Sequence, residues 1–296
     1  MSWSIKYEGL ISCVGINYSE ENFILLKSTH SLNLATYRFH VDQPRGLVFL
    51  FHGLHKASSD MAFVAQFLFR RGFAVAAFDQ EGQGNSEGER GTFTDINDQV
   101  VDCIEFIEKT KLLYDKSVPI FCIGVTLGGA LCVKIALKRP DLLNGVILYG
   151  PTLDIDPNFN PRIQRIIGVL NSCCCKNLRL KAIDQGGNSQ NSHYANYCYE
   201  NPGFFSGKMN VKTAYAILQG LRELQPQIKK FNCPVLLFHG KKDKMMGSRS
   251  SIEFFEKCES ADKEILLFPE VHHAVVHEPE FGEILEKTAD WLRKRT

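Results

Sequence analysis

Six short apolar runs recur along the chain, and each is bounded by turn residues or by charged residues. They span residues 47–51, 74–78, 120–123, 146–149, 235–238 and 265–268. Because these runs are apolar at every position instead of alternating with polar residues, they are typical of strands buried on both faces of a parallel sheet. The pattern therefore predicts a sheet of six buried strands.

Helical patterns lie between several of these runs. The segment 62–71 ends before Gly72, the segment 96–109 has apolar positions spaced by four and three residues, and the segment 130–139 stops at Pro140. Glycine after a helix and proline beyond its last turn are common stop signals. Strands that alternate with helices predict a doubly wound α/β fold, with a mostly parallel central sheet flanked by helices.

The alternation stops between residues 153 and 225. This stretch is rich in Asn, Gln, Cys and Ser and has only modest helical patterns, yet a structureless loop of that length is improbable in a compact domain. Because a strand pattern resumes at Pro234, the stretch is interpreted as an inserted cap of short helices, with a separate small domain as the alternative. The predicted boundaries are 1–152 and 229–296 for the two parts of the core and 153–228 for the cap.

The strongest local motif follows the third apolar run. Gly124, Thr126 and Gly128 match the G-x-S-x-G nucleophile elbow, except that threonine stands at the nucleophile position. In that motif a strand feeds a helix through a strained turn, and small flanking residues let the nucleophile project over the edge of the sheet. A glycine-rich turn that is merely closely packed is the alternative interpretation.

Three other segments place polar groups at strand ends. His52-Gly53-Leu54 follows the first apolar run, where acyl-transfer enzymes of this architecture place an oxyanion-hole N–H. Asp243 lies just past the fifth run, and His272 and His273 lie beyond the last. The chain order of nucleophile, acid and histidine is that of the α/β-hydrolases.

These residues resemble the monoacylglycerol lipase and lysophospholipase branch of the α/β-hydrolase superfamily. Residues 78–88 are similar to that branch's Asp-x-x-Gly-x-Gly-x-Ser loop, and residues 50–54 to its His-Gly strand end. Residues 273–280 are similar to its catalytic-histidine segment, in which Glu-Pro follows, and this alignment puts His273 in the catalytic place. The resemblance covers roughly residues 32–292 and is weak over 155–201.

The resemblance implies a serine-type esterase or lipase that acts on a single-chain lipid ester through an acyl-enzyme, without a cofactor or metal. In this sequence Thr126 would attack, His273 would be the general base, and Asp243 would fix the imidazole tautomer. The N–H groups of Leu54 and Leu127 would hold the oxyanion. The cap would form the pocket for a lipid-like ester or fatty acyl ligand.

The sequence departs from the family pattern at three places. Thr126 replaces serine, Val125 replaces histidine, and residues 55–57 replace a polar stretch. A β-branched residue at the positive φ of the elbow costs about 1–3 kcal/mol. Two hypotheses follow. The first is a hydrolase of low or altered activity, which the retained Asp243 and His273 favour. The second is an inactive homologue that serves as a lipid-binding or structural subunit of a complex, which the replaced serine favours.

Composition narrows the class of protein further. The 34 Lys and Arg residues against 33 Asp and Glu residues give a net charge of +1, which offers no electrostatic reason to bind nucleic acid. Residues 1–10 lack the apolar region of a signal peptide, and the uncharged run 117–133 is too short and too interrupted to span a membrane. The ten cysteines are therefore interpreted as reduced thiols of an intracellular protein, cytoplasmic or peripheral to a membrane.

Three adjacent cysteines, Cys173, Cys174 and Cys175, stand in the predicted cap. Adjacent residues cannot easily converge on one tetrahedral ion, so they do not predict a zinc site. They follow the apolar stretch 163–170 and precede basic residues, as in acylated segments that contact a membrane. Buried or idle thiols are the alternative.

Overall fold

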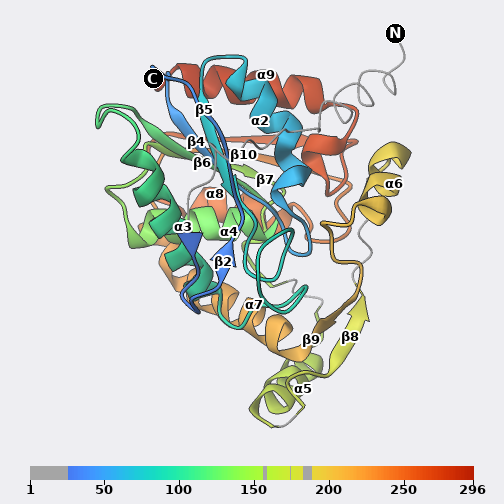
Figure 1. Cartoon of the computed structure of the whole chain (residues 1–296). Helices are drawn as coiled ribbons and strands as arrows, with labels where there is room; N and C mark the ends of the chain where they lie inside the picture. The colour runs from blue at the N-terminus through green and yellow to red at the C-terminus, as the bar shows by residue number, and fades with distance from the viewer. Residues whose placement is uncertain (1–25, 156–158, 174, 183–188) are drawn as a thin grey trace.

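The computed structural model describes residues 26–155, 159–173, 175–182 and 189–296. A seven-stranded sheet lies at its centre, with helices on both sides (Figure 1). The strand order is β11-β10-β7-β6-β4-β5-β3. In chain order these strands are β3 (Thr36–Phe39), β4 (Leu47–Phe51), β5 (Ala74–Phe78), β6 (Ile120–Val125), β7 (Gly145–Tyr149), β10 (Val235–Gly240) and β11 (Lys263–Phe268). The predicted α/β fold is confirmed.

The six apolar runs of the sequence all form strands, and these six are mutually parallel. The pattern missed β3, a four-residue strand that pairs antiparallel with β5. The expectation of burial on both faces was also wrong for β11, which is an edge strand whose residues are only partly buried or exposed. A small two-stranded sheet of β1 (Leu26–Lys27) and β2 (Asn33–Leu34) precedes the main sheet.

Helices cover the two faces of the sheet and make two cores. One face carries α3 (Ile96–Lys111), α4 (Leu127–Lys138) and α8 (Arg249–Lys257), and the other carries η2 (Ser58–Met61), α2 (Ala62–Phe69), η4 (Val275–His277) and α9 (Phe281–Arg293). Along β4 the side chains alternate between the cores: Phe49 and Phe51 belong to the first, and Val48 and Leu50 to the second. This period of two is what a strand buried on both faces requires.

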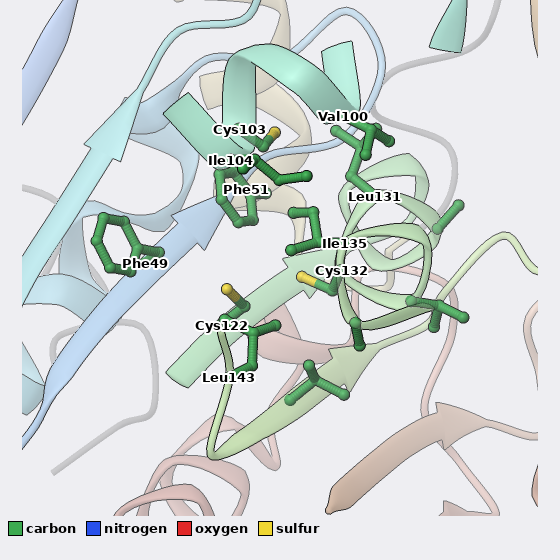
Figure 2. Close-up of a cluster of buried hydrophobic side chains, with 14 of the residues drawn as sticks. Phe49, Phe51, Val100, Cys103, Ile104, Cys122, Leu131, Cys132, Ile135 and Leu143 are labelled. Atoms are coloured by element: carbon green, nitrogen blue, oxygen red, sulfur yellow. The ribbon is translucent and has the colours of Figure 1, made fainter. Parts of the chain in front are cut away.

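Cysteines contribute to the first core. Figure 2 shows Cys103, Cys122 and Cys132 among the apolar side chains of β4, α3 and α4. Burial raises the pKa of the Cys103 and Cys122 thiols, so these groups pack as small uncharged side chains. No cysteine in the described part of the chain forms a disulfide, whereas Cys13 and Cys174 lie outside the described residues.

The chain leaves the main sheet after β7 and returns at β10. Between them lie α5 (Pro161–Ser172), β8 (Arg179–Ala182), α6 (Ser192–Glu200), β9 (Lys208–Asn210), α7 (Val211–Leu224) and η3 (Gln225–Lys230). The pairing of β8 with β9 differs from the expected cap of helices alone, because strands this short carry no readable period. Leu221 and Leu224 of α7 belong to the first core, so α7 joins this segment to the sheet.

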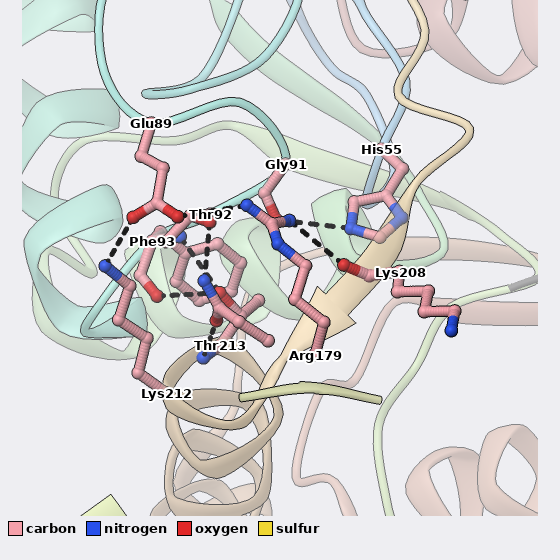
Figure 3. Close-up of polar contacts among 10 residues, drawn as sticks. His55, Glu89, Gly91, Thr92, Phe93, Arg179, Lys208, Lys212 and Thr213 are labelled. Carbon is pink, nitrogen blue, oxygen red and sulfur yellow. Dashed lines mark hydrogen bonds and ion pairs between the residues drawn. The ribbon is translucent and has the colours of Figure 1, made fainter. Parts of the chain in front are cut away.

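One acidic residue links the segment after β7 to a core loop. Glu89 accepts from Arg179 of β8 at 3.1 Å and from Lys212 of α7 at 2.7 Å (Figure 3). Nearby, Asn210 donates to the Thr92 hydroxyl at 2.7 Å, and Thr213 donates to the Phe93 carbonyl at 3.1 Å. These contacts fix the start of α7 over the loop that follows β5.

Candidate active site

Thr126 lies in the turn between β6 and α4. Its φ is +52° and its ψ is −111°, a backbone conformation that is an outlier for a β-branched residue. The flanking glycines allow the turn: a Cβ on Gly124 would lie 2.3 Å from the Gly128 carbonyl oxygen, and a Cβ on Gly128 would lie 2.0 Å from the Phe51 carbonyl oxygen. The geometry is that of a strained strand-to-helix elbow.

The structure brings the Thr126 hydroxyl to a histidine. Thr126 Oγ1 lies 2.9 Å from His273 Nε2, and His273 Nδ1 lies 2.7 Å from Asp243 Oδ2. The three residues come from the loops after β6, β10 and β11, which meet at one edge because the three strands are parallel. His272 does not join this chain of contacts, and its Nδ1 lies 3.5 Å from Glu278 Oε2 instead.

Both oxygens of Asp243 are fully engaged. Oδ1 accepts from the backbone N–H groups of Met245 and Met246 at 2.8 and 3.0 Å, while Oδ2 contacts His273 and His239. Burial alone would raise the pKa of Asp243, but the hydrogen bonds from His239 and His273 outweigh it and hold the pKa well below its usual range. The carboxylate is therefore ionised, and it orients His273 with Nδ1 protonated and Nε2 open toward the Thr126 hydroxyl.

His239 is a member of the site that the sequence pattern missed. It lies on β10 with no exposed surface, its Nε2 is 3.0 Å from Asp243 Oδ2, and its Nδ1 is 2.7 Å from the Ser251 hydroxyl. A donor to the carboxylate at Nε2 leaves Nδ1 as the acceptor for Ser251. A histidine within an apolar strand is the signal that a polar partner lies nearby.

His52 and Gly53 shape the loop opposite the elbow. His52 is buried, its Nε2 accepts from the Gln80 N–H at 3.0 Å, and its Nδ1 lies 2.8 Å from the Gly53 carbonyl. Burial lowers the pKa of His52, so the ring is neutral and its contacts are structural. A Cβ on Gly53 would lie 3.3 Å from the Thr126 Cβ, so glycine here allows the loop to approach the elbow closely.

Leu54 and Leu127 both border the space in front of Thr126. Leu127 is the first residue of α4, so its N–H has no acceptor one turn earlier in the helix and remains available at the helix N-terminus. Leu54 follows Gly53 in the chain, at the point where the loop after β4 closely approaches the elbow. The two residues occupy the positions from which backbone N–H groups serve an oxyanion in this type of elbow.

A cavity of about 450 Å³ opens beside Thr126 and His273. Its wall is largely apolar and comes from both the core and the segment after β7. The apolar residues from that segment are Phe159, Ile163, Ile167, Leu180, Met209, Ala214, Ile217 and Leu218. A pocket of this size and character suits a flexible apolar ligand.

One end of the cavity is polar. Lys56, Asp60, Tyr194 and His277 line it. The Tyr194 hydroxyl donates to Asp60 Oδ1 at 3.1 Å, His277 Nε2 lies 3.3 Å from the same oxygen, and the Tyr194 ring stacks on His277 with centroids 3.7 Å apart. Burial raises the pKa of Asp60, but the charge and hydrogen bond of His277 prevail, with Lys56 and Tyr194 assisting, and lower the pKa to about 2. The cavity thus combines an apolar body with a charged end.

A family model described as serine aminopeptidase, S33, matches residues 42–280. Among curated relatives, the monoglyceride lipase of Rattus norvegicus is 26% identical over 254 residues, which cover 85% of this chain and 84% of the relative. The monoacylglycerol lipase of Mycolicibacterium smegmatis is 25% identical over 256 residues, covering 84% and 88%.

Solved structures are similar over almost their whole length. The monoacylglycerol lipase of Paleococcus ferrophilus matches with a TM-score of 0.79 and 26% identity, covering 89% of this chain and 99% of that one. A soluble variant of the Saccharomyces cerevisiae monoglyceride lipase, solved with a substrate analogue, matches with a TM-score of 0.77 and 23% identity, covering 96% and 99%. The chain therefore belongs to the serine aminopeptidase S33 family of α/β-hydrolases, in the branch that includes the monoglyceride lipases.

Proposed function

We propose that the protein is a carboxylic-ester hydrolase that acts on single-chain lipid esters, with Thr126 as its nucleophile. The observation that carries the proposal is the continuous contact from Thr126 Oγ1 through His273 to Asp243, with distances of 2.9 and 2.7 Å, at the wall of the apolar cavity. The names of the relatives support the substrate class, because two of them are monoglyceride or monoacylglycerol lipases.

The reaction begins with attack of Thr126 Oγ1 on the ester carbonyl carbon, while His273 Nε2 takes the hydroxyl proton. The N–H groups of Leu54 and Leu127 stabilise the oxyanion of the tetrahedral intermediate. His273 then returns the proton to the leaving alcohol, and an acyl-threonine remains. Water, deprotonated by His273, hydrolyses this ester and restores Thr126.

Threonine makes this site slower than a serine would. The side chain already has the hydrogen bond that deprotonation needs, but its methyl group restricts χ1 and occupies space next to the attacking oxygen. A displacement of about 1 Å from the productive geometry costs on the order of a hundredfold in rate. The proposed activity is therefore low, and it is limited by the nucleophile while the rest of the site is in place.

Turnover of p-nitrophenyl esters and monoacylglycerols by the wild type, Thr126→Ser and Thr126→Ala tests the proposal. We expect low activity for the wild type, at least tenfold higher kcat for Thr126→Ser because the methyl group is removed, and none for Thr126→Ala. Trapping of an acyl-enzyme at residue 126, detected by mass spectrometry, identifies the nucleophile directly. Equal activity of the wild type and Thr126→Ala would refute the role of Thr126.

A second function is favoured by the strained threonine itself. An inactive homologue would keep the cavity as a lipid-binding site or as part of a structural subunit, because nothing in lipid binding requires a serine at residue 126. The same variants separate the two functions. A wild type as inert as Thr126→Ala, together with an active Thr126→Ser, would support the inactive homologue, and fatty-acid binding by the wild type would then be its remaining property.

A further inference from the structure

The amine of Lys56 contacts the thiol of Cys198. Lys56 lies in the loop between β4 and η2, Cys198 lies on α6 of the segment after β7, and the distance from Nζ to Sγ is 2.8 Å. Both side chains are buried, with exposed fractions of 9% and 1%. The contact therefore joins two parts of the chain that are 142 residues apart.

The surroundings of the amine are unusual for a buried lysine. Lys56 Nζ lies 5.0 Å from the ring centroid of Tyr194 and 4.5 Å from that of Phe204. Within the described part of the chain, its direct contacts are thus a sulfur atom and two aromatic faces, without an ion pair to a carboxylate. Buried lysines are normally paired with a carboxylate, so the position of Lys56 against sulfur calls for a chemical explanation.

Peroxide oxidation of Cys198 would make its sulfur an electrophile in contact with the Lys56 amine. Reacting atoms held about 3–3.5 Å apart and aligned are close to an attack geometry, and the amine nitrogen already lies 2.8 Å from the sulfur. Lys56 also borders the cavity, so a small neutral oxidant that enters the cavity reaches the amine that contacts the Cys198 sulfur. We propose that Lys56 and Cys198 form a covalent, reducible cross-link when the protein meets hydrogen peroxide.

The chemistry balances with one molecule of peroxide. The Cys198 thiol is oxidised by two electrons to a sulfenic acid, as its sulfur takes one oxygen from hydrogen peroxide and water leaves. The ammonium of Lys56 releases a proton, and the amine then attacks the sulfenyl sulfur with its nitrogen lone pair. The S–N bond forms, the S–O bond breaks, and the departing hydroxide takes a second proton from the nitrogen and leaves as water. The product is a sulfenamide, and a dithiol reductant returns it to thiol and amine.

The cross-link would change both the cap and the cavity. It would tie α6 to the loop after β4 by a covalent bond, and it would replace the ammonium charge at the polar end of the cavity with a neutral nitrogen. That charge is one of the influences that lower the pKa of Asp60. Oxidation would thus hold the segment after β7 in place beside the cavity and remove one charge from the polar end of the cavity. This effect does not depend on whether the protein hydrolyses esters.

Peptide mapping of the full-length protein tests the proposal without any activity assay. The wild type is treated with hydrogen peroxide, digested and analysed by mass spectrometry with and without dithiothreitol. We expect a peptide pair that joins Lys56 to Cys198 with the loss of two hydrogen atoms, no tryptic cleavage after Lys56, and full reversal by dithiothreitol. The pair is absent in Cys198→Ser and in Lys56→Arg, since a guanidinium stays protonated and does not attack.

The chain offers a matched control at Cys258. It is also a buried thiol, and Lys263 Nζ lies near it, but that amine binds the carbonyl oxygen of Cys258 at 2.9 Å and not its sulfur. We expect Cys258→Ser to keep the Lys56–Cys198 cross-link and the wild type to form none at Cys258. Dimedone, which traps sulfenic acids, should label Cys198 in Lys56→Arg and leave it unlabelled in the wild type.

Three results would overturn the proposal. One is oxidation of Cys198 to sulfinic or sulfonic acid in the wild type with Lys56 still cleaved by trypsin. Another is a Cys198 that stays a thiol under conditions that oxidise the exposed Cys173. The last is equal dimedone labelling of Cys198 in the wild type and in Lys56→Arg, because the amine would then play no part.

Discussion

Thr126 combines a strained backbone with a well-placed hydroxyl. Its φ of +52° is imposed by the turn and its two close-packed glycines, Gly124 and Gly128, so the strain exists whichever side chain occupies the position. A β-branched side chain adds to that cost. The hydrogen bond of 2.9 Å to His273 nevertheless has the length that proton transfer requires. At this scale the contacts from Thr126 through His273 to Asp243 are formed, and the proposed nucleophile differs from a serine by one methyl group.

His239 acts on the site through Asp243 and is a positioning residue. Removing its ring in His239→Ala takes away one hydrogen bond to Asp243 Oδ2 and leaves the Ser251 hydroxyl without its partner. Because this hydrogen bond lowers the pKa of Asp243, its loss raises that pKa. In the Thr126→Ser background we expect kcat to fall roughly tenfold with KM almost unchanged. The acidic limb of the kcat profile, which reports protonation of the general base, should move to higher pH, because a carboxylate that has lost one donor favours the protonated imidazole more strongly.

The conservative variant His239→Gln is the control, since its amide N–H is able to donate to Asp243. It should restore part of kcat and return the acidic limb toward lower pH. A merely structural role for His239 would lower the melting temperature without changing the pH profile. An unchanged profile in His239→Ala would therefore contradict the positioning role.

Helix α5 presents an apolar stripe to solvent. Ile163, Ile166 and Val169 are 46%, 55% and 68% exposed, and Ile163 also borders the cavity on its inner side. Basic residues Arg162 and Arg165 stand on the same helix. An exposed apolar stripe beside basic residues favours contact with an anionic lipid surface, and here Ile163 connects the stripe to the cavity wall. Among the described residues, no helix has the length and apolar character to cross a bilayer.

We expect Ile166→Glu combined with Val169→Glu to reduce binding to phosphatidylserine-containing vesicles at least fivefold in a flotation assay, because two charges would enter the interface. Leu112→Glu is the matched control, since Leu112 is 78% exposed at the end of α3 and away from the cavity. Equal losses for the α5 pair and for Leu112→Glu would argue against a specific role of α5.

Acylation of Cys173 stays a prediction. It is suggested by the apolar stretch 163–170 before this cysteine and the basic residues after it, and hydroxylamine-sensitive labelling checks it.

The polar end of the cavity joins the core to the segment after β7 and makes the stability of the fold depend on pH. Asp60 of η2 is buried against His277 of η4 and Tyr194 of α6, so three elements meet at one carboxylate. Its pKa in the folded protein is about 2, below the ordinary value of 3.8. The ionised carboxylate therefore stabilises the fold above pH 4, and this contribution is lost as the pH falls through about 2.

Asp60→Asn should accordingly lower the free energy of unfolding at pH 7 by on the order of 2 kcal/mol. The difference from the wild type should shrink as the pH is lowered from about 4 to 2, because the wild type loses its carboxylate there. Urea unfolding at a series of pH values measures both quantities. A difference that stays constant down to pH 2 would mean that asparagine acts by packing and not by charge.

Sequence and structure differ in what they reveal, and particular residues show why. The runs that became β4, β5, β6, β7 and β10 are visible in the sequence because strands buried on both faces are apolar throughout. The sequence pattern does not predict the short strands β3, β8 and β9, since three or four residues are too few to show a period. Thr126, Asp243 and His273 were named because each follows a strand in an order that is typical of one chemistry.

By itself, then, the sequence determined the alternating α/β framework and the family, and it predicts Thr126, Asp243 and His273 as the catalytic residues. Only the tertiary structure decided that their atoms lie within hydrogen-bond distance, that Thr126 has a positive φ, and that His239 shares the carboxylate of Asp243. It also decided the contact between Lys56 and Cys198. The physical reason is that periodicity and motifs report local burial and local turns, whereas contacts between residues tens of positions apart depend on how the strand ends and the cap pack together.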